Sequence, residues 1–179
     1  MLRMLWMLLT YRSRGPLPLL GTSRLSGRVW PNDLDSNLHM NNGRYFTLAD
    51  LGRFDHGLRS GLWERALKRG WRPVAGDCSG RFSASLQPFA RYELESRLLG
   101  WDAKWFFIEH RYKLGDRVAA VVAVRYLLLG KQGPVPTAQA LALIDHREPS
   151  PELPEWIAGW RDAQDALVGQ LKRDAGSRR

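Results

Sequence analysis

Four strand-like segments follow one another between residues 73 and 131, and they limit what this chain can fold into more than any other feature. Each segment is bounded by a short turn, with hairpin-like turn residues at Gly100–Asp102 and Gly115–Asp116. The last segment is almost continuously apolar, as expected of a strand that is covered on both faces. The four segments are PVAGDCSGRFSASLQPF, YELESRLLGWD, KWFFIEHRYKLG and DRVAAVVAVRYLLLGK. They predict four successive strands.

A helical segment precedes these strands. Apolar residues recur at helical intervals from Asn42 to about Arg69, and Gly57 and Gly61 are expected to break the helix into two pieces. The stretch SRLSGRVWP before it predicts a short strand that ends at Pro31. One long helix followed by an antiparallel meander predicts an α+β domain in which the sheet wraps the helix. A short helix in PVPTAQALALID, a terminal helix in PELPEWIAGWRDAQDALVGQLKRDA and a frayed tail GSRR complete the expected order.

The N-terminal stretch MLRMLWMLLTYRSR is apolar but short. It has about half of the roughly 20 residues that a membrane-spanning helix needs, and it lacks the small-residue cleavage site of a signal peptide. One alternative is an interfacial helix that places apolar side chains among lipid headgroups, with arginines as anchors. The apolar residues would be Leu2, Leu5, Trp6 and Leu9, and the anchors Arg3, Arg12 and Arg14. The favoured alternative is a helix that docks on its own domain or on a partner subunit.

The chain has 179 residues and a formal net charge of +9, which suits one domain with an anionic partner. The arginines are spread along the chain and no nucleic-acid-binding module is present, so no nucleic-acid partner is predicted. The single cysteine, Cys78, excludes an internal disulfide and fits a reducing compartment. Zinc spacings and phosphate-binding glycine motifs are absent, so neither a metal nor a cofactor is predicted.

The stretch NDLDSNLHMNNGRY, between the expected first strand and the helix, concentrates the polar chemistry of the chain. Asp33, Asp35 and Asn37 match the opening of a calcium-binding EF-hand loop. That loop requires glycine at its sixth position and glutamate at its twelfth, where this chain has Leu38 and Arg44. Because an arginine cannot bind a cation, a calcium site is excluded.

A helix cap explains part of this loop. Asn41 or Asn42 can accept hydrogen bonds from the free N–H groups of the helix, and Asp33 can stabilise the turn. A helix cap does not explain why Asp35, Asn37 and His39 occupy alternate positions in the loop. Capping therefore leaves the cluster only partly explained.

A catalytic site accounts for the remaining residues. If the loop is locally extended, Asp35, Asn37 and His39 point the same way and converge. An aspartate can attack a carbonyl carbon or deprotonate a water, a histidine can move a proton, and an asparagine can orient either. The helix start near Asn42 offers free N–H groups and a positive dipole end, and Gly43 permits close approach of a substrate. Such a site suits a developing oxyanion.

The motif NDLDSNLHMNNGRYF at a strand-to-helix junction resembles the hotdog-fold thioesterases of the broad 4-hydroxybenzoyl-CoA thioesterase type. Within these thioesterases, the chain looks closest to the branch that resembles thioesterase superfamily member 6. In that branch VWPNDLDSNLHMNNGRY is followed by RGWRPV and LLGWDAKWFF, and these segments also occur here. The resemblance covers about Ser23 to Gly130. It implies an antiparallel sheet wrapped around a long central helix, in agreement with the order of elements above.

The resemblance also implies roles for individual residues. In hotdog thioesterases with a D-x-D loop the second aspartate is the base or nucleophile, which corresponds to Asp35. The similar D-x-N-x-H sequence of plant acyl-carrier-protein thioesterases places the catalytic residues at Asp35, Asn37 and His39. Those enzymes have a further cysteine, where this chain has Pro88 near the expected place, and Cys78 lies too far upstream to replace it. The absence of this cysteine favours a mechanism in which Asp35 activates a water molecule.

The resemblance therefore implies hydrolysis of acyl-CoA thioesters in the cytoplasm, by a homodimer or higher homo-oligomer with active sites at the shared interface. Substrate contacts are expected from Asn41, Asn42, Gly43 and Arg44. The expected division is an N-terminal helix and linker over 1–22, a hotdog domain over 23–147, and a C-terminal helix with its tail over 148–179.

Two alternatives stay open. One is a non-catalytic acyl-CoA-binding or lipid-binding hotdog protein with peripheral membrane contact through residues 1–14. The other is hydration or dehydration of CoA thioesters, for which related hotdog enzymes use a longer D-x-x-x-x-H loop that this chain lacks. The sequence does not distinguish coenzyme A from acyl-carrier protein as the carrier.

Overall fold

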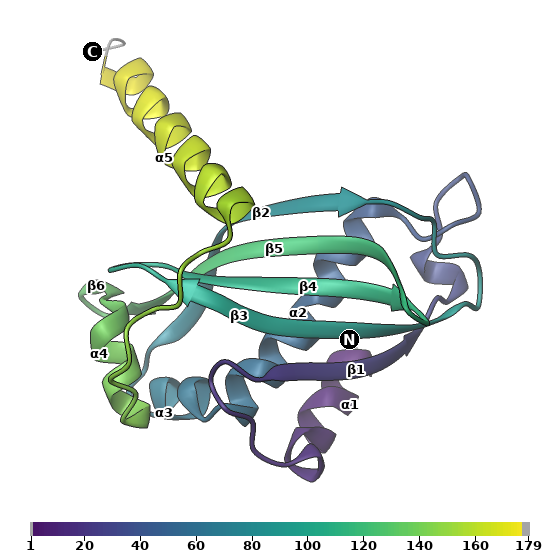
Figure 1. Cartoon of the computed structure of the whole chain (residues 1–179), viewed down its shortest axis with the longest axis horizontal. Helices are drawn as coiled ribbons and strands as arrows, with labels where there is room; N and C mark the ends of the chain where they lie inside the picture. Colours follow the sequence, from purple (N-terminus) through teal and green to yellow (C-terminus); the bar gives the residue numbers. More distant parts are fainter. Residues whose placement is uncertain (1, 177–179) are drawn as a thin grey trace.

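The computed structural model describes residues 2–176, and in it an antiparallel sheet curls around one long helix (Figure 1). The sheet runs in the order β1-β3-β4-β5-β2, with β6 paired to β5. Its strands are β1 Thr22–Arg28, β2 Arg72–Phe82, β3 Arg91–Trp101, β4 Phe106–Leu114, β5 Arg117–Gly130 and β6 Gly133–Val135. The helices are α1 Leu2–Thr10, α2 Asn42–Arg59, α3 Leu62–Lys68, α4 Thr137–Leu141 and α5 Glu155–Gly176. The predicted α+β hotdog fold is confirmed.

The central helix α2 lies unusually close to the inner face of the sheet. Its buried side includes Gly52, where an added Cβ would lie 2.0 Å from the Ser96 hydroxyl oxygen on β3. The hydroxyl of Tyr112, on β4, donates a 2.6 Å hydrogen bond to the carbonyl oxygen of Tyr45 on α2. A residue without a side chain therefore sets the distance at which the helix packs on the sheet.

The break between α2 and α3 falls at Ser60 and Gly61, and Gly61 takes the left-handed conformation with φ 75°. The prediction that Gly57 also breaks the helix was wrong. Gly57 lies inside α2, where a Cβ would come within 2.3 Å of the Trp63 ring. Its small size is used for packing and not for a turn. The strand β2 ends at Phe82, earlier than the segment predicted, and the short β6 was not predicted.

The first turns of α5 cover the outer face of the sheet. Ile157 packs there in a small buried cluster with side chains from three strands: Leu99, Phe107 and Ala123. Beside the cluster Arg125 is only 2% exposed, and it pairs with Asp77 of β2 and Asp165 of α5 at 2.5 and 2.6 Å. This cover on β5 confirms the prediction of a strand buried on both faces. The rest of α5 projects away from the sheet (Figure 1).

The N-terminal helix α1 docks on its own domain at the β1 side of α2. Met7 is buried, and two arginines reach buried carboxylates: Arg3 binds Asp33 and Arg14 binds Asp55, each at 2.5 Å. This agrees with the favoured prediction of a docked helix. The interfacial alternative assigned Arg3 and Arg14 as lipid anchors, and their pairing with buried carboxylates contradicts that assignment. The apolar residues named with them do face outward: Leu2, Leu5, Trp6 and Leu9 are 55% to 84% exposed. Within residues 2–176, no helix combines the length and apolar character needed to cross a membrane.

Two histidines are buried between α2 and the sheet. His110 on β4 shares a 2.7 Å hydrogen bond with the Ser96 hydroxyl through Nδ1, and His56 lies on α2. The Nε2 atoms of both have no hydrogen-bond partner among residues 2–176. Burial lowers the pKa of His56 to about 4, and burial together with nearby Arg53 lowers the pKa of His110 well below its ordinary value. Both rings are therefore neutral in the folded protein.

Acid should destabilise the fold through these rings. Between pH 6.5 and 4 the unfolded chain binds a proton at His56, while the same ring in the folded chain stays neutral. The free energy of unfolding therefore falls as the pH drops from 6.5 toward 4. The full shift corresponds to about 3 kcal/mol of unfolding free energy for His56. Urea denaturation at several pH values in this window should show a shallower pH dependence for His56→Gln than for wild type. The more exposed His39→Gln serves as the control, and identical pH dependence in His56→Gln and wild type would contradict the prediction.

Candidate active site

The loop between β1 and α2 is a closed turn. After a 3₁₀ turn at Pro31–Asp33, an isolated bridge joins Leu34 to Met40. Inside it, the Asp35 carboxylate accepts a 2.9 Å hydrogen bond from the Asn37 N–H, and Leu38 has a positive φ of 56°. The expectation that the loop is locally extended was therefore wrong. A short aspartate side chain that bonds the backbone two residues on favours a tight turn over an extended chain.

This turn, and not alternation along a strand, brings Asp35 and His39 together. The Asp35 Oδ1 and the His39 Nδ1 are 3.6 Å apart, and both side chains are partly exposed. Asn37 is exposed, and its contact with Asp35 is made by its backbone N–H. The structure thus brings together the side chains of Asp35 and His39, two of the three predicted catalytic residues. Asn37 contributes its backbone N–H to the turn.

The start of α2 is capped by Asn41. Its side-chain oxygen accepts a 2.8 Å hydrogen bond from the Gly43 N–H, and its carbonyl oxygen accepts one from the Arg44 N–H. The expected cap is confirmed. Because the cap uses the Gly43 N–H, this group is not one of the free N–H groups expected at the helix start. Of the N–H groups of residues 42 to 44, only that of Asn42 has no hydrogen-bond partner among the described residues. A developing oxyanion at this helix start would therefore meet the Asn42 donor.

Asp33, the first aspartate of the D-x-D sequence, is completely buried. Burial alone would raise its pKa, but hydrogen bonds from Arg3, the Trp30 N–H and Arg44 outweigh that effect and hold the pKa below its usual range. Arg44, expected to contact the substrate, makes two hydrogen bonds to Asp33 at 2.8 and 2.9 Å. Asp33 and Arg44 thereby fix the base of the loop that carries Asp35.

A cavity of about 210 Å³ adjoins this loop. It lies between the loop, the first turn of α2 and the segment that follows β2. Its lining comprises His39, Met40, Asn42, Tyr45, Phe82, Ser83, Ala84 and Ser85. Because ligand pockets usually measure about 300 to 1,000 Å³, one chain provides room for only part of a substrate. The hydroxyls of Ser83 and Ser85 were missed from the sequence, since no local pattern marks a segment that closes a cavity beside a distant loop.

The single cysteine does not join this site. Cys78 is exposed on β2 and does not line the cavity. Partial burial of the sulfur, with nearby Asp77 and Asp50, raises the pKa of the thiol above its ordinary value. A raised pKa disfavours the reactive thiolate, which agrees with a mechanism that needs no cysteine.

Comparisons with known proteins give one consistent result. Residues 29–160 match the family model of the thioesterase-like superfamily. Protein THEM6 of Xenopus laevis is 36% identical over 160 residues, which is 88% of this chain and 76% of that protein. Among solved structures, the probable thioesterase YbaW from Escherichia coli has a TM-score of 0.63 at 15% identity, covering 68% of this chain and 96% of that one. A 4-hydroxybenzoyl CoA thioesterase mutant complexed with 4-hydroxybenzoyl CoA has a TM-score of 0.61 at 12% identity, covering 69% and 99%.

Proposed function

Because this chain belongs to the thioesterase-like superfamily, we propose that it hydrolyses acyl-CoA thioesters to a free acid and coenzyme A. The family supports thioester hydrolysis in general. The CoA carrier is supported by the 4-hydroxybenzoyl CoA thioesterase that shares the fold, and by the net charge of +9, which attracts the phosphates of coenzyme A. The observation that carries the proposal is the Asp35–His39 pair, with His39 lining the same cavity as Asn42, the first residue of α2.

The proposed reaction is general-base catalysis. The Asp35 carboxylate accepts a proton from a water molecule whose oxygen attacks the thioester carbonyl carbon. His39, 3.6 Å from the carboxylate, lines the cavity and positions the water. The carbonyl oxygen becomes an oxyanion that accepts a hydrogen bond from the Asn42 N–H, at the positive end of α2. The carbon–sulfur bond then breaks, and the leaving thiolate of coenzyme A takes the proton that Asp35 had accepted, which returns Asp35 to its carboxylate form.

The remaining expected residues support this centre indirectly. Asn41 caps the first turn of α2 through the Gly43 N–H. A Cβ at position 43 would lie 3.1 Å from the Asn41 side-chain oxygen, so Gly43 leaves room for this cap. Asn37 keeps the turn closed through its backbone. Arg44 acts on the loop through Asp33.

The experiment that tests the function is thiol release from a panel of acyl-CoAs with short, long and aromatic acyl groups. Turnover of at least one class is expected. Saturable acyl-CoA binding without turnover on any substrate would favour the alternative, a non-catalytic acyl-CoA-binding or lipid-binding protein at a membrane surface. The exposed apolar side chains of α1, with Trp6 among them, are the observation that supports that alternative.

A homodimer formed through β2 would complete the small cavity. The eleven-residue strand β2 is at one edge of the sheet, so one side of its backbone is available for pairing, and Phe82 at its end lines the cavity. A second copy paired there would add surface to the open side of the site. Light scattering during size-exclusion chromatography at micromolar concentration should give about twice the chain mass of 20.5 kDa, or a higher multiple. A strictly monomeric species would contradict the dimer.

A further inference from the structure

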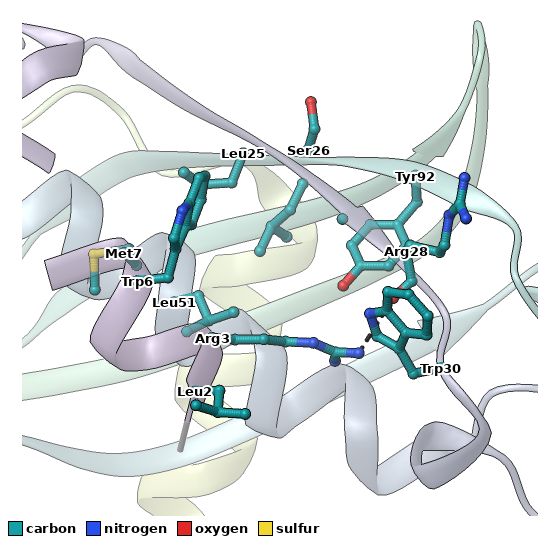
Figure 2. Close-up of a pocket in the computed structure, with 12 residues that line it drawn as sticks. Leu2, Arg3, Trp6, Met7, Leu25, Ser26, Arg28, Trp30, Leu51 and Tyr92 are labelled. Carbon is teal, nitrogen blue, oxygen red and sulfur yellow. Dashed lines mark hydrogen bonds between the residues drawn. The ribbon is translucent and has the colours of Figure 1, made fainter. Parts of the chain in front are cut away.

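A second cavity, of about 290 Å³, lies near the β1 edge of the sheet, under α1 (Figure 2). It shares no lining residue with the cavity beside His39, which lies toward the opposite edge strand β2. Its apolar walls come from α1, β1, α2 and β3. The side chains that form them are Leu2, Trp6, Met7, Leu25, Leu51 and Leu94, of which Leu2 and Trp6 are 84% and 60% exposed, so the cavity is open to solvent on the α1 side. These residues offer an aliphatic ligand a non-polar surface on several sides.

One polar side chain enters this cavity without a partner. Tyr92 on β3 is only 6% exposed, and Figure 2 shows its hydroxyl directed into the cavity. Its ring crosses the strand at Gly27, where an added Cβ would lie 2.3 Å from the ring. None of the hydrogen bonds among residues 2–176 uses this hydroxyl, although other buried tyrosines such as Tyr112 bond the backbone. The Tyr92 hydroxyl oxygen is not one of the fully buried unpaired side-chain atoms, so it is open to the cavity and free to donate a hydrogen bond to a ligand there.

The same end of the cavity carries a positive charge. Arg3 lines the cavity, and its guanidinium binds Asp33, which also binds Arg44. Two guanidinium groups share one carboxylate, so the cluster retains one net positive charge. The opposite end, between Trp6, Leu25 and Leu51, is apolar. The cavity therefore has a positively charged end with a hydroxyl donor and a hydrocarbon end.

We propose that this cavity binds a fatty acid, with its carboxylate at the Tyr92 hydroxyl beside Arg3 and its chain against Trp6, Leu25 and Leu51. A water molecule occupies about 30 Å³, so 290 Å³ accommodates on the order of ten groups of that size, which corresponds to a medium-length chain. Binding here goes beyond hydrolysis. It does not require Asp35, and it holds whether or not the proposed hydrolysis is correct.

Isothermal titration with sodium decanoate, below its micellar concentration, tests the site. Wild type should bind about one equivalent per chain. Tyr92→Phe removes only the hydroxyl and should weaken binding about tenfold, as expected for a hydrogen bond to a charged group. Leu51→Trp fills the cavity from the partly exposed face of α2 and should weaken binding at least as much. The matched controls are Tyr11→Phe and Leu67→Trp, which change residues outside the cavity and should bind as wild type does.

Two further titrations complete the test. Decanol lacks the carboxylate and should bind about tenfold more weakly than decanoate if the positive end recognises the head group. Asp35→Asn should keep the wild-type decanoate affinity, since its side chain is outside this cavity. The proposal is overturned by the absence of saturable binding, or by unchanged affinity in both Tyr92→Phe and Leu51→Trp. Loss of decanoate binding in Asp35→Asn would place the fatty acid in the candidate active site instead.

Discussion

Replacing Asp35 with asparagine is expected to lower kcat for acyl-CoA hydrolysis by about 10²- to 10⁴-fold, the usual contribution of a general base. Asparagine has nearly the same shape, and its side-chain oxygen can still accept the hydrogen bond from the Asn37 N–H that closes the turn. It cannot accept a proton from water at neutral pH. The loop should therefore keep its form while the chemistry fails. Thiol release under single-turnover and steady-state conditions measures the loss.

The control is Asp116→Asn, which makes the same change in the exposed turn between β4 and β5 and should leave kcat as in wild type. The thermal unfolding midpoint of Asp35→Asn should stay near that of wild type, because the carboxylate is partly exposed and, among residues 2–176, has no ion pair shorter than the 3.6 Å contact with His39. Equal turnover in Asp35→Asn and wild type would mean that another residue activates the water.

Replacing Asp33 with asparagine should lower the free energy of unfolding by about 3 kcal/mol. The carboxylate is completely buried and holds Arg3, Arg44 and the Trp30 N–H at once. An uncharged amide leaves two guanidinium groups close together without compensation. Their side chains are 27% and 30% exposed, so solvent reduces the cost to the lower end of the range for a broken buried pair. Urea denaturation at neutral pH measures the difference.

A control substitution in an exposed ion pair separates the loss of the buried Asp33 cluster from the general effect of removing a negative charge. Asp162→Asn breaks an ion pair with Arg161 on α5, where the two side chains are 66% and 32% exposed, and should cost less than about 1 kcal/mol. A loss of similar size in both variants would show that the buried cluster has no special role. Turnover should also fall in Asp33→Asn, because Asp33 fixes the base of the loop that carries Asp35.

The order of helices and strands was predictable because it depends on local periodicity. The meander, the central helix and the break at Gly61 all follow from patterns within a few residues. The error at Gly57 has a physical source, since glycine in a helix can serve either a turn or close packing. Only the position of Trp63 on the next helix decides between the two.

The sequence indicated which residues form the candidate site, but not how the loop arranges them. The residue types of the loop indicated Asp35 and His39, but the closure of the turn by Asp35 itself was not anticipated. The pairing of Arg3 with Asp33 joins residues 30 positions apart, and that of Arg14 with Asp55 joins residues 41 apart. No periodicity relates such distant positions. The two cavities are likewise lined by residues that lie far apart in the sequence, so their positions were not predictable from it.

Arg3 of α1 and Arg14 of the 3₁₀ turn after it attach the N-terminal segment to two buried aspartates, and this restricts how the protein can change in evolution. A mutation that removes Arg3 or Arg14 leaves a buried carboxylate with one guanidinium partner fewer. A compensating change at Asp33 or Asp55 then leaves the second arginine, Arg44 or Arg59, without its carboxylate. Each single step toward losing the helix is therefore selected against, although the outer side of the same helix can vary without this constraint. Lineages that carry this arrangement should retain the four arginines and two aspartates together, while the residues equivalent to Leu5 and Leu9 diverge.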